Sequence, residues 1–178
     1  QNHIAFKNLR NITSNPHGVG EGSNQANCIT GRGNTAIIID HIEVINCNNP
    51  VRLGGGSPGN EIMHSNFMQV RGDAAILLEA GANIWDANKI HDNYIELLHN
   101  RAAPPNQANP RYGGPDGIQT SSGMSIYQNT FKYITTKVYT STQHPDILQL
   151  QGNFIKVYNN EFINIADAGI DYDCYANG

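Results

Sequence analysis

The sequence predicts an all-β fold, a parallel β-helix of about six coils with three short strands in each coil. Three observations support this fold class. One apolar spacing recurs along the whole chain, the apolar segments are short, and Asn, Gly and Asp flank them. The 178 residues then form one domain, 1–178, because a single coil cannot bury its apolar face without its neighbours.

The first two strands of each coil come from the recurring spacing. An aliphatic residue is followed five positions later by a large apolar residue and three positions after that by another. The starting positions are 25 to 36 residues apart. A helical solenoid with that period would show 3.6-residue periodicity over longer runs. The six sets are Ile4/Leu9/Ile12, Ile37/Ile42/Ile45, Ile62/Phe67/Val70, Ile90/Ile95/Leu98, Ile126/Phe131/Ile134 and Val157/Phe162/Ile165.

The third strand of each coil is a further short apolar segment, and most of these segments end near a Gly, which favours a turn. They lie at 28–29, 51–53, 76–78, 118–120, 148–150 and 170–172.

Side chains alternate across a strand, so each third strand also has an outer face. With Ile118 and Leu148 pointing inward, Gln119 and Gln149 point outward, and Asp171 continues the row in the last coil. The sequence therefore predicts one outer row of side chains along this sheet. Thr30 and Arg52 extend it toward the first coil, and Leu77 interrupts it.

Long loops precede the third strand in three coils, at residues 13–26, 99–115 and 135–145. Long loops without regular structure in a compact fold are usually functional or disordered. Three of them beside one sheet predict the wall of a groove over coils four to six. The alternative is that they are tolerated surface insertions.

Charge and hydropathy exclude several partners. The net charge of −4 and the pI near 5.9 disfavour nucleic acid, which requires a basic face. The chain contains no apolar run of about 20 residues, so no membrane span is expected. The chain begins almost inside a strand and stops just after one. We therefore expect a segment of a longer chain, with flanking domains, or a homotrimer whose neighbours cover the ends.

The cysteines Cys28, Cys47 and Cys174 are widely spaced and form no CxxC motif, so a zinc or redox site is not expected. Small buried hydrophobic side chains are the preferred interpretation. One disulfide with one free thiol is the alternative, and the spacing does not assign the pair.

Asp116 and Asp146 are the candidate acid–base pair. Both enter a third strand at the loop corner, and adjacent coils would bring their backbones to about 5 Å. Two carboxylates that close raise one pKa, which supplies an acid beside a base for glycoside hydrolysis. His144, two residues before Asp146, is a candidate general base or sugar ligand. The alternative is that both Asp residues bond the turn backbone.

Gln119, Gln149 and Asp171 are candidate ligands of sugar hydroxyls, although stacked amides also form structural ladders. Arg111, Tyr112 and Lys137, in the flanking loops, are further candidate substrate-binding residues. Arg111 and Lys137 are also candidate bases for a lyase, and Tyr112 is a candidate stacking platform for a sugar ring. Asp146, Asp171 and Asp173 are candidate oxygen ligands of Ca²⁺, a weaker prediction because no DxDxDG loop is present.

The stretches DGIQT-SSG-MSIYQNTFKYI and HPDILQLQG-NFIKVYNNEFINI resemble the pectate-lyase-like superfamily of right-handed parallel β-helices. The resemblance implies a right-handed helix, a polysaccharide-binding groove along one sheet, and a catalytic Asp in the DGI step, at Asp116. The function expected is that of an extracellular or cell-surface polysaccharide lyase or glycoside hydrolase. The alternatives are a non-catalytic carbohydrate-binding β-helix of a phage tail spike or adhesin, and a purely structural solenoid.

Overall fold

The computed structural model describes residues 3–10, 12, 27–33, 36–47, 49–55, 58–70, 74–79, 81–99, 116–135, 146–165 and 169–173. Within these residues the chain forms 17 strands, and every strand pairing is parallel. None of the described residues belongs to a helix that is long and apolar enough to cross a membrane.

The strands form three sheets, here called the first, second and third sheet in the order in which each coil visits them. The first sheet contains β1 (His3–Lys7), β3 (Ala36–Asp40), β6 (Glu61–Met63), β9 (Asn88–His91), β12 (Met124–Tyr127) and β15 (Lys156–Tyr158). The second sheet contains β4 (Glu43–Ile45), β7 (Asn66–Val70), β10 (Tyr94–His99), β13 (Thr130–Thr135) and β16 (Glu161–Ile163). The third sheet contains β2 (Asn27–Arg32), β5 (Asn49–Gly54), β8 (Ala74–Leu78), β11 (Asp116–Thr120), β14 (Asp146–Gln151) and β17 (Gly169–Asp173).

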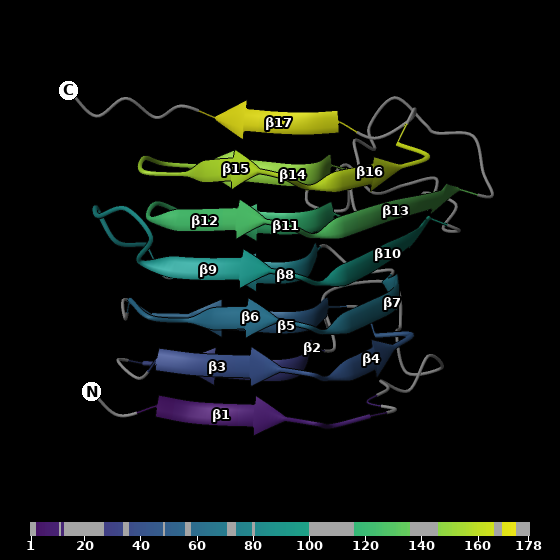
Figure 1. Ribbon diagram of the computed structural model, residues 1–178, viewed down its shortest axis with the longest axis horizontal. Coiled ribbons are helices and arrows are strands. Elements are labelled where there is room, and N and C mark those ends of the chain that lie inside the picture. Colours follow the sequence, from purple (N-terminus) through teal and green to yellow (C-terminus); the bar gives the residue numbers. More distant parts are fainter. Residues whose placement is uncertain are drawn as a thin grey trace, which may run out of the picture.

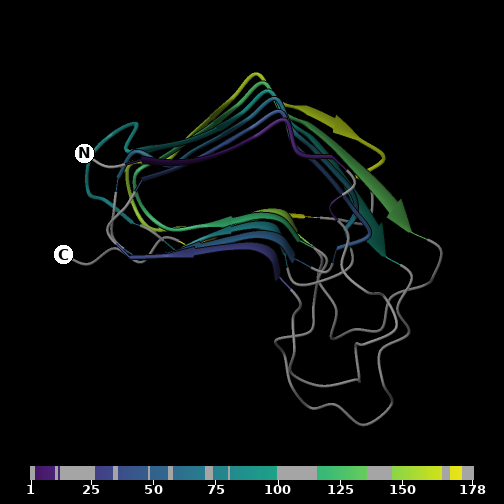
Figure 2. The same cartoon turned by 90° about the horizontal axis from the view of Figure 1, so that it is seen from below.

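The coils stack in chain order from β1 to β17, as Figure 1 shows. An isolated parallel bridge between Ile12 and Val44 occupies the second-sheet position of the first coil. Viewed along the stack, the strands of each sheet superimpose, and the first and third sheets face each other across the core (Figure 2). This arrangement confirms the predicted right-handed parallel β-helix of about six coils, with three strands per coil.

The core consists of columns of apolar side chains that run from coil to coil. In the second sheet Phe67 pairs with Ile95, Ile95 with Phe131, and Phe131 with Phe162. The rings of Phe131 and Phe162 stack with centroids 5.3 Å apart. Because equivalent inward positions recur in each coil, burial is continuous along the stack, and stacking stabilises what one coil cannot.

In the later coils the predicted repeat starts at the correct residue. In the first two coils the predicted start lies two residues before the observed one. Ile62 pairs with Ile39, and Ile39 pairs with Phe6. The column therefore begins with Phe6 and Ile39, not with the predicted Ile4 and Ile37. Residues two positions apart point to the same side of a strand. The predicted and observed residues therefore share a face, and the prediction is wrong by one pleat.

The third member of the repeat is also displaced in coils four and five. Val70 pairs with Leu97, and Leu97 pairs with Tyr133, so these residues replace the predicted Leu98 and Ile134. The register shifts between β7 and β10, where Gln69 adopts φ 54°. This β-bulge adds one residue to β7 and produces the three-residue spacing there.

A ladder of buried and part-buried asparagines lines the corner between the first and second sheets. Asn93, Asn129 and Asn160 follow β9, β12 and β15 at equivalent positions, and Ser65 precedes them. The Oδ1 atom of Asn129 accepts bonds from the backbone N–H and the side-chain amide of Asn93 (3.1 and 3.0 Å). Asn160 Oδ1 accepts the same two bonds from Asn129. The ladder satisfies backbone donors that the turn would leave unpaired.

Cys28 and Cys47 form a disulfide whose Cα atoms are 6.4 Å apart. The preferred interpretation of both residues as separate buried thiols is therefore wrong, and the alternative of one disulfide is correct. Cys28 lies on β2 of the first coil and Cys47 follows β4 of the second, so neighbouring coils bring them within bonding distance. Cys174 lies outside the described residues.

Candidate functional site

The predicted outer row of the third sheet is present in register. Arg52 pairs with Leu77, Leu77 with Gln119, and Gln119 with Gln149. Thr30 continues the row at one end and Asp171 at the other, as the backbone pairings show. These four central side chains are partly exposed, whereas the residues on either side of each are mostly buried. The row is therefore a continuous outer surface that crosses the coils.

The central part of the row is charged on one side of Leu77 and carries two amides on the other. Arg52 donates through Nη2 to Glu79 Oε1 at 2.7 Å, and Glu79 directly follows β8. The Nε atom of Arg52 is buried and has no hydrogen-bond partner among the described residues. Two amides, those of Gln119 and Gln149, lie on adjacent strands beyond Leu77. Arginine, an ion-paired carboxylate, an aliphatic side chain and two amides thus share one face.

Asp116 and Asp146 begin β11 and β14 on adjacent coils, as predicted. Asp116 Oδ1 accepts a hydrogen bond of 2.8 Å from the backbone N–H of Asp146, and Asp146 is only 5% exposed. Asn49 holds the corresponding place in an earlier coil, where its Oδ1 accepts a bond of 3.3 Å from the backbone N–H of Ala74. Asp116 thus accepts a backbone hydrogen bond from the next coil, as Asn49 does. For Asp116 this agrees with the alternative prediction, that the Asp residues bond the turn backbone. Its catalytic role stays a prediction.

Close contact with the neighbouring strand requires a glycine at the second position of the DGI step. A Cβ atom at Gly117 would lie 2.3 Å from the backbone oxygen of Ile147. A side chain at this position would push β11 and β14 apart, because real Cβ contacts that short do not occur. The glycine therefore preserves the close approach that carries the bond between Asp116 and Asp146.

The other predicted site residues are placed only in part. His144, Arg111, Tyr112 and Lys137 lie outside the described residues, as do most of the three long loops. For calcium, the register places Asp173 opposite Gln151, which is about 16 Å along the strand direction from Asp146 at about 3.3 Å per residue. The side chains of Asp171 and Asp173 are not among those that the structure describes, so the Ca²⁺ set stays a prediction.

A second polar surface, on the outer face of the first sheet, was not predicted. Met63, His91, Tyr127 and Tyr158 pair in succession along one column. The ring of His91 stacks on Tyr127 at 4.6 Å, and Tyr127 stacks on Tyr158 at 5.0 Å, with nearly parallel planes. This stacked column crosses three coils. Burial, followed by the neighbouring Tyr158, raises the pKa of Tyr127, so its hydroxyl remains protonated at neutral pH.

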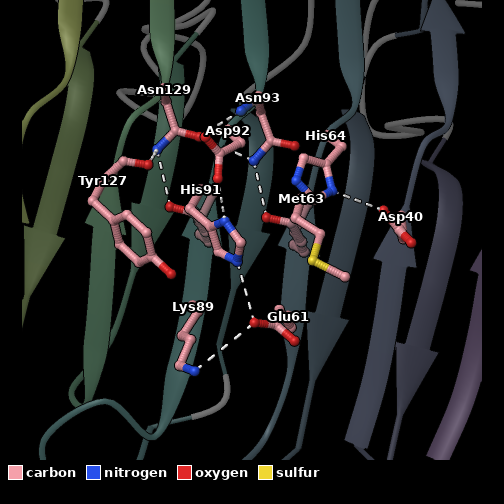
Figure 3. Close-up of polar contacts among 12 residues, drawn as sticks. Asp40, Glu61, Met63, His64, Lys89, His91, Asp92, Asn93, Tyr127 and Asn129 are labelled. Atoms are coloured by element: carbon pink, nitrogen blue, oxygen red, sulfur yellow. Dashed lines mark hydrogen bonds and ion pairs between the residues drawn. The ribbon is translucent and has the colours of Figure 1, made fainter.

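His91 is held by carboxylates at both ring nitrogens. Its Nδ1 atom lies 2.7 Å from Asp92 Oδ2, and its Nε2 atom lies 3.2 Å from Glu61 Oε1 (Figure 3). Lys89 Nζ is 3.9 Å from the same Glu61 oxygen. Because both ring nitrogens have partners and the residue is 8% exposed, His91 orders this face rather than offering a free imidazole.

Trp85 lies beside this face, in the segment between β8 and β9. The segment is the teal loop at the left of Figure 2. The indole is 54% exposed, meets Phe154 edge-on at 5.2 Å, and has Lys156 Nζ 5.2 Å from its centroid. Lys156 also bonds Asp86 at 2.7 Å. The Lys156 bond, followed by one from Ser125, lowers the pKa of the Asp86 carboxyl.

The sequence feature that could have located this face is a polar residue directly before the position that the asparagine ladder occupies in each coil. His41 precedes Ile42, His64 precedes Ser65, and Asp92 precedes Asn93. All three adopt φ of 49–54°, the left-handed region. A polar residue that recurs at one turn position in successive coils must form a column, whatever its chemistry.

Comparison of the chain with protein-family models, with curated proteins and with solved structures finds no match.

Proposed function

We propose that the protein is an extracellular β-helix that binds a polysaccharide along the outer face of the third sheet, over coils four to six. The observation that carries the proposal is the in-register row of the third sheet. Gln119, Gln149 and the backbone position of Asp171 continue it through coils four to six, and Leu77 and Arg52 extend it to coils three and two. Adjacent strands are about 4.8 Å apart, which is close to the length of one sugar unit in an extended chain. A polysaccharide along the row would meet one side chain per unit.

The chemistry of the row suits a sugar. The amides of Gln119 and Gln149 can both donate to and accept from hydroxyl groups. Leu77 offers an apolar contact for the C–H face of a ring, and Arg52 offers a cation for a uronate. The Cys28–Cys47 disulfide supports the extracellular part of the proposal, because such bonds persist in oxidising compartments. We also propose that the protein is a member of the pectate-lyase-like superfamily.

Cleavage of the bound polysaccharide is a second candidate function. The observation that favours it is the placement of Asp116 and Asp146 at the same end of adjacent strands, beside the row. In this proposal one carboxyl protonates the leaving oxygen and the other acts as nucleophile or base, with His144 assisting. The ladder bond of Asp116 favours binding without cleavage, as in a tail spike or adhesin.

The binding proposal is tested with a panel of neutral and uronate-containing polysaccharides, in affinity electrophoresis and calorimetry. The double variant Gln119→Ala/Gln149→Ala should weaken binding about tenfold or more, because each lost hydrogen bond is worth about 1 kcal/mol. The control is Asn66→Ala, which removes an exposed amide from the outer face of the second sheet. Equal binding by both variants would remove the third-sheet row from the proposal.

The cleavage proposal needs a variant that separates charge from the ladder bond. Asp116→Asn keeps an Oδ1 acceptor, as Asn49 shows in its own coil, and removes the carboxylate. The wild type should release unsaturated products, seen by ultraviolet absorbance, or reducing ends. Asp116→Asn should abolish that release at an unchanged melting temperature. If the wild type releases neither product from any glycan that it binds, the protein is a binding module.

A further inference from the structure

One cluster on the corner between the first and second sheets takes no part in the proposed function. Asp40 ends β3, His41 follows it, and His64 follows β6 in the next coil. Asp40 Oδ1 lies 2.5 Å from His41 Nδ1 and 3.0 Å from His64 Nδ1. Figure 3 shows the His64 ring turned toward the Asp40 carboxylate. Two imidazoles from adjacent coils thus converge on one oxygen.

The backbone accounts for this convergence. His41 and His64 have φ of 53° and 49° and occupy the same turn position in successive coils. Because both residues have nearly the same positive φ at the same turn position, their side chains project in similar directions, one strand spacing apart. Their rings accordingly lie 4.8 Å apart at the centroids. Asp40 belongs to the outer column of the first sheet, so its carboxylate reaches both rings from one side.

We propose that Asp40, His41 and His64 form a binding site for a divalent transition metal ion of the zinc type. One ligand atom from each residue lies within 4.8 Å of the other two. Imidazole nitrogen and carboxylate oxygen are the ligands that Zn²⁺, Ni²⁺ and Cu²⁺ accept. Zinc bonds of about 2.0–2.1 Å in tetrahedral geometry place ligand atoms about 3.3 Å apart. The 2.5 and 3.0 Å separations therefore need to open by less than about 1 Å.

The surroundings leave room for such an ion. The side chains of His41 and His64 are 59% and 43% exposed, so solvent molecules can complete the coordination. Lys7 Nζ lies 3.5 Å from Asp40 Oδ2 and is the cation that would compete for this carboxylate. The Lys7 side chain is itself half exposed, so it can turn away into solvent when an ion binds.

His91, the next histidine along this face, does not join the site. Its ring centroid is 6.0 Å from that of His64, and Asp92 and Glu61 bond its two nitrogens. The site therefore has two imidazoles and one carboxylate from this part of the chain. His91 serves as the matched control, because its removal deletes an imidazole from the same face without deleting a proposed ligand.

The experiment titrates the full chain, without a polyhistidine tag and freed of metal by chelation, with Zn²⁺ and Ni²⁺ in a calorimeter. One ion should bind per chain. His41→Gln and His64→Gln should each weaken binding at least about tenfold, since loss of a ligand's outer partner alone costs about 10–100-fold. Gln is tolerated at this turn position, because Gln128 adopts φ 55° there in another coil.

Three further variants separate this site from other sources of affinity. His91→Gln should bind Zn²⁺ as the wild type does, and Cys174→Ser tests for thiol binding outside the described residues. Lys7→Gln should tighten binding by removing the competing cation. NMR resonances of the His41 and His64 rings should shift on addition of Zn²⁺. Binding that survives in the double variant His41→Gln/His64→Gln, or no binding by the wild type at millimolar Zn²⁺, would overturn the proposal.

Discussion

Asp116 bonds the backbone N–H of Asp146 through its Oδ1 atom, at 2.8 Å, across the start of two adjacent strands. The bond repeats the one that Asn49 makes to Ala74 in an earlier coil. A carboxylate and an amide thus accept the same kind of backbone hydrogen bond at one column of the third sheet. An acidic residue at a loop–strand junction is therefore not by itself a sign of catalysis in this fold.

The first prediction separates the shape of Asp116 from its charge. Asp116→Asn should leave the free energy of unfolding within about 0.5 kcal/mol of the wild type, because the acceptor remains. Asp116→Ala should lower it by about 1–3 kcal/mol, since a part-buried N–H loses its partner. Urea denaturation followed by circular dichroism measures both. Equal destabilisation by the two variants would show that charge, and not the ladder bond, stabilises this corner.

The second prediction concerns the asparagine ladder. Asn129 is 1% exposed, accepts two bonds from Asn93 and donates to the backbone oxygen of Ile90. Asn129→Ala should lower the free energy of unfolding by about 2–4 kcal/mol, because it leaves several buried groups unpaired. The exposed Asn153→Ala is the matched control and should change it by less than about 0.5 kcal/mol. If the ladder does not stabilise the folded state, the two variants will have the same urea midpoint.

The fold was predictable because its signal repeats. The five-residue spacing from Ile62 to Phe67, and its equivalents in later coils, joins two inward positions across one turn. The register of the second coil was not predictable, because three consecutive isoleucines, 37–39, leave no alternation to read. The three-residue spacing failed at Leu98, because it depends on a bulge at Gln69 that has no marker in the sequence.

The candidate sites divide in the same way. The row through Gln119 and Gln149 was predictable, because strand alternation alone decides which side chains point outward. The cluster of Asp40 and His64 was not, because it depends on which turn positions of neighbouring coils coincide. The interval between coils varies from 23 to 36 residues, so a pattern of histidines has no fixed period to detect. The shared turn position of His41 and His64 becomes readable only with the correct register of the second coil, in which Ile39 pairs with Ile62.

The third prediction concerns the disulfide. Cys28 and Cys47 are 19 residues apart, and closing a loop of that size stabilises the folded state by about 3 kcal/mol in the chain-entropy description. Reduction with dithiothreitol should therefore lower the urea midpoint of the wild type. Cys28→Ser/Cys47→Ser should show the lower midpoint from the start and no response to the reductant. Cys174→Ser is the control and should respond to reduction as the wild type does.

The last prediction follows from the Asp40 carboxyl, whose pKa lies below its ordinary value of 3.8. The hydrogen bond from His64 is the largest cause; burial opposes it, and His41 and Lys7 add to it. A lowered folded pKa contributes stability that is complete above about pH 4 and is lost as the pH falls through the folded value. The melting temperature of the wild type should therefore fall more steeply below pH 4 than that of Asp40→Asn. Glu161→Gln removes a negative charge from β16 and should retain the wild-type slope. If the slope of Asp40→Asn equals that of the wild type, the two histidines do not stabilise the Asp40 carboxylate in solution.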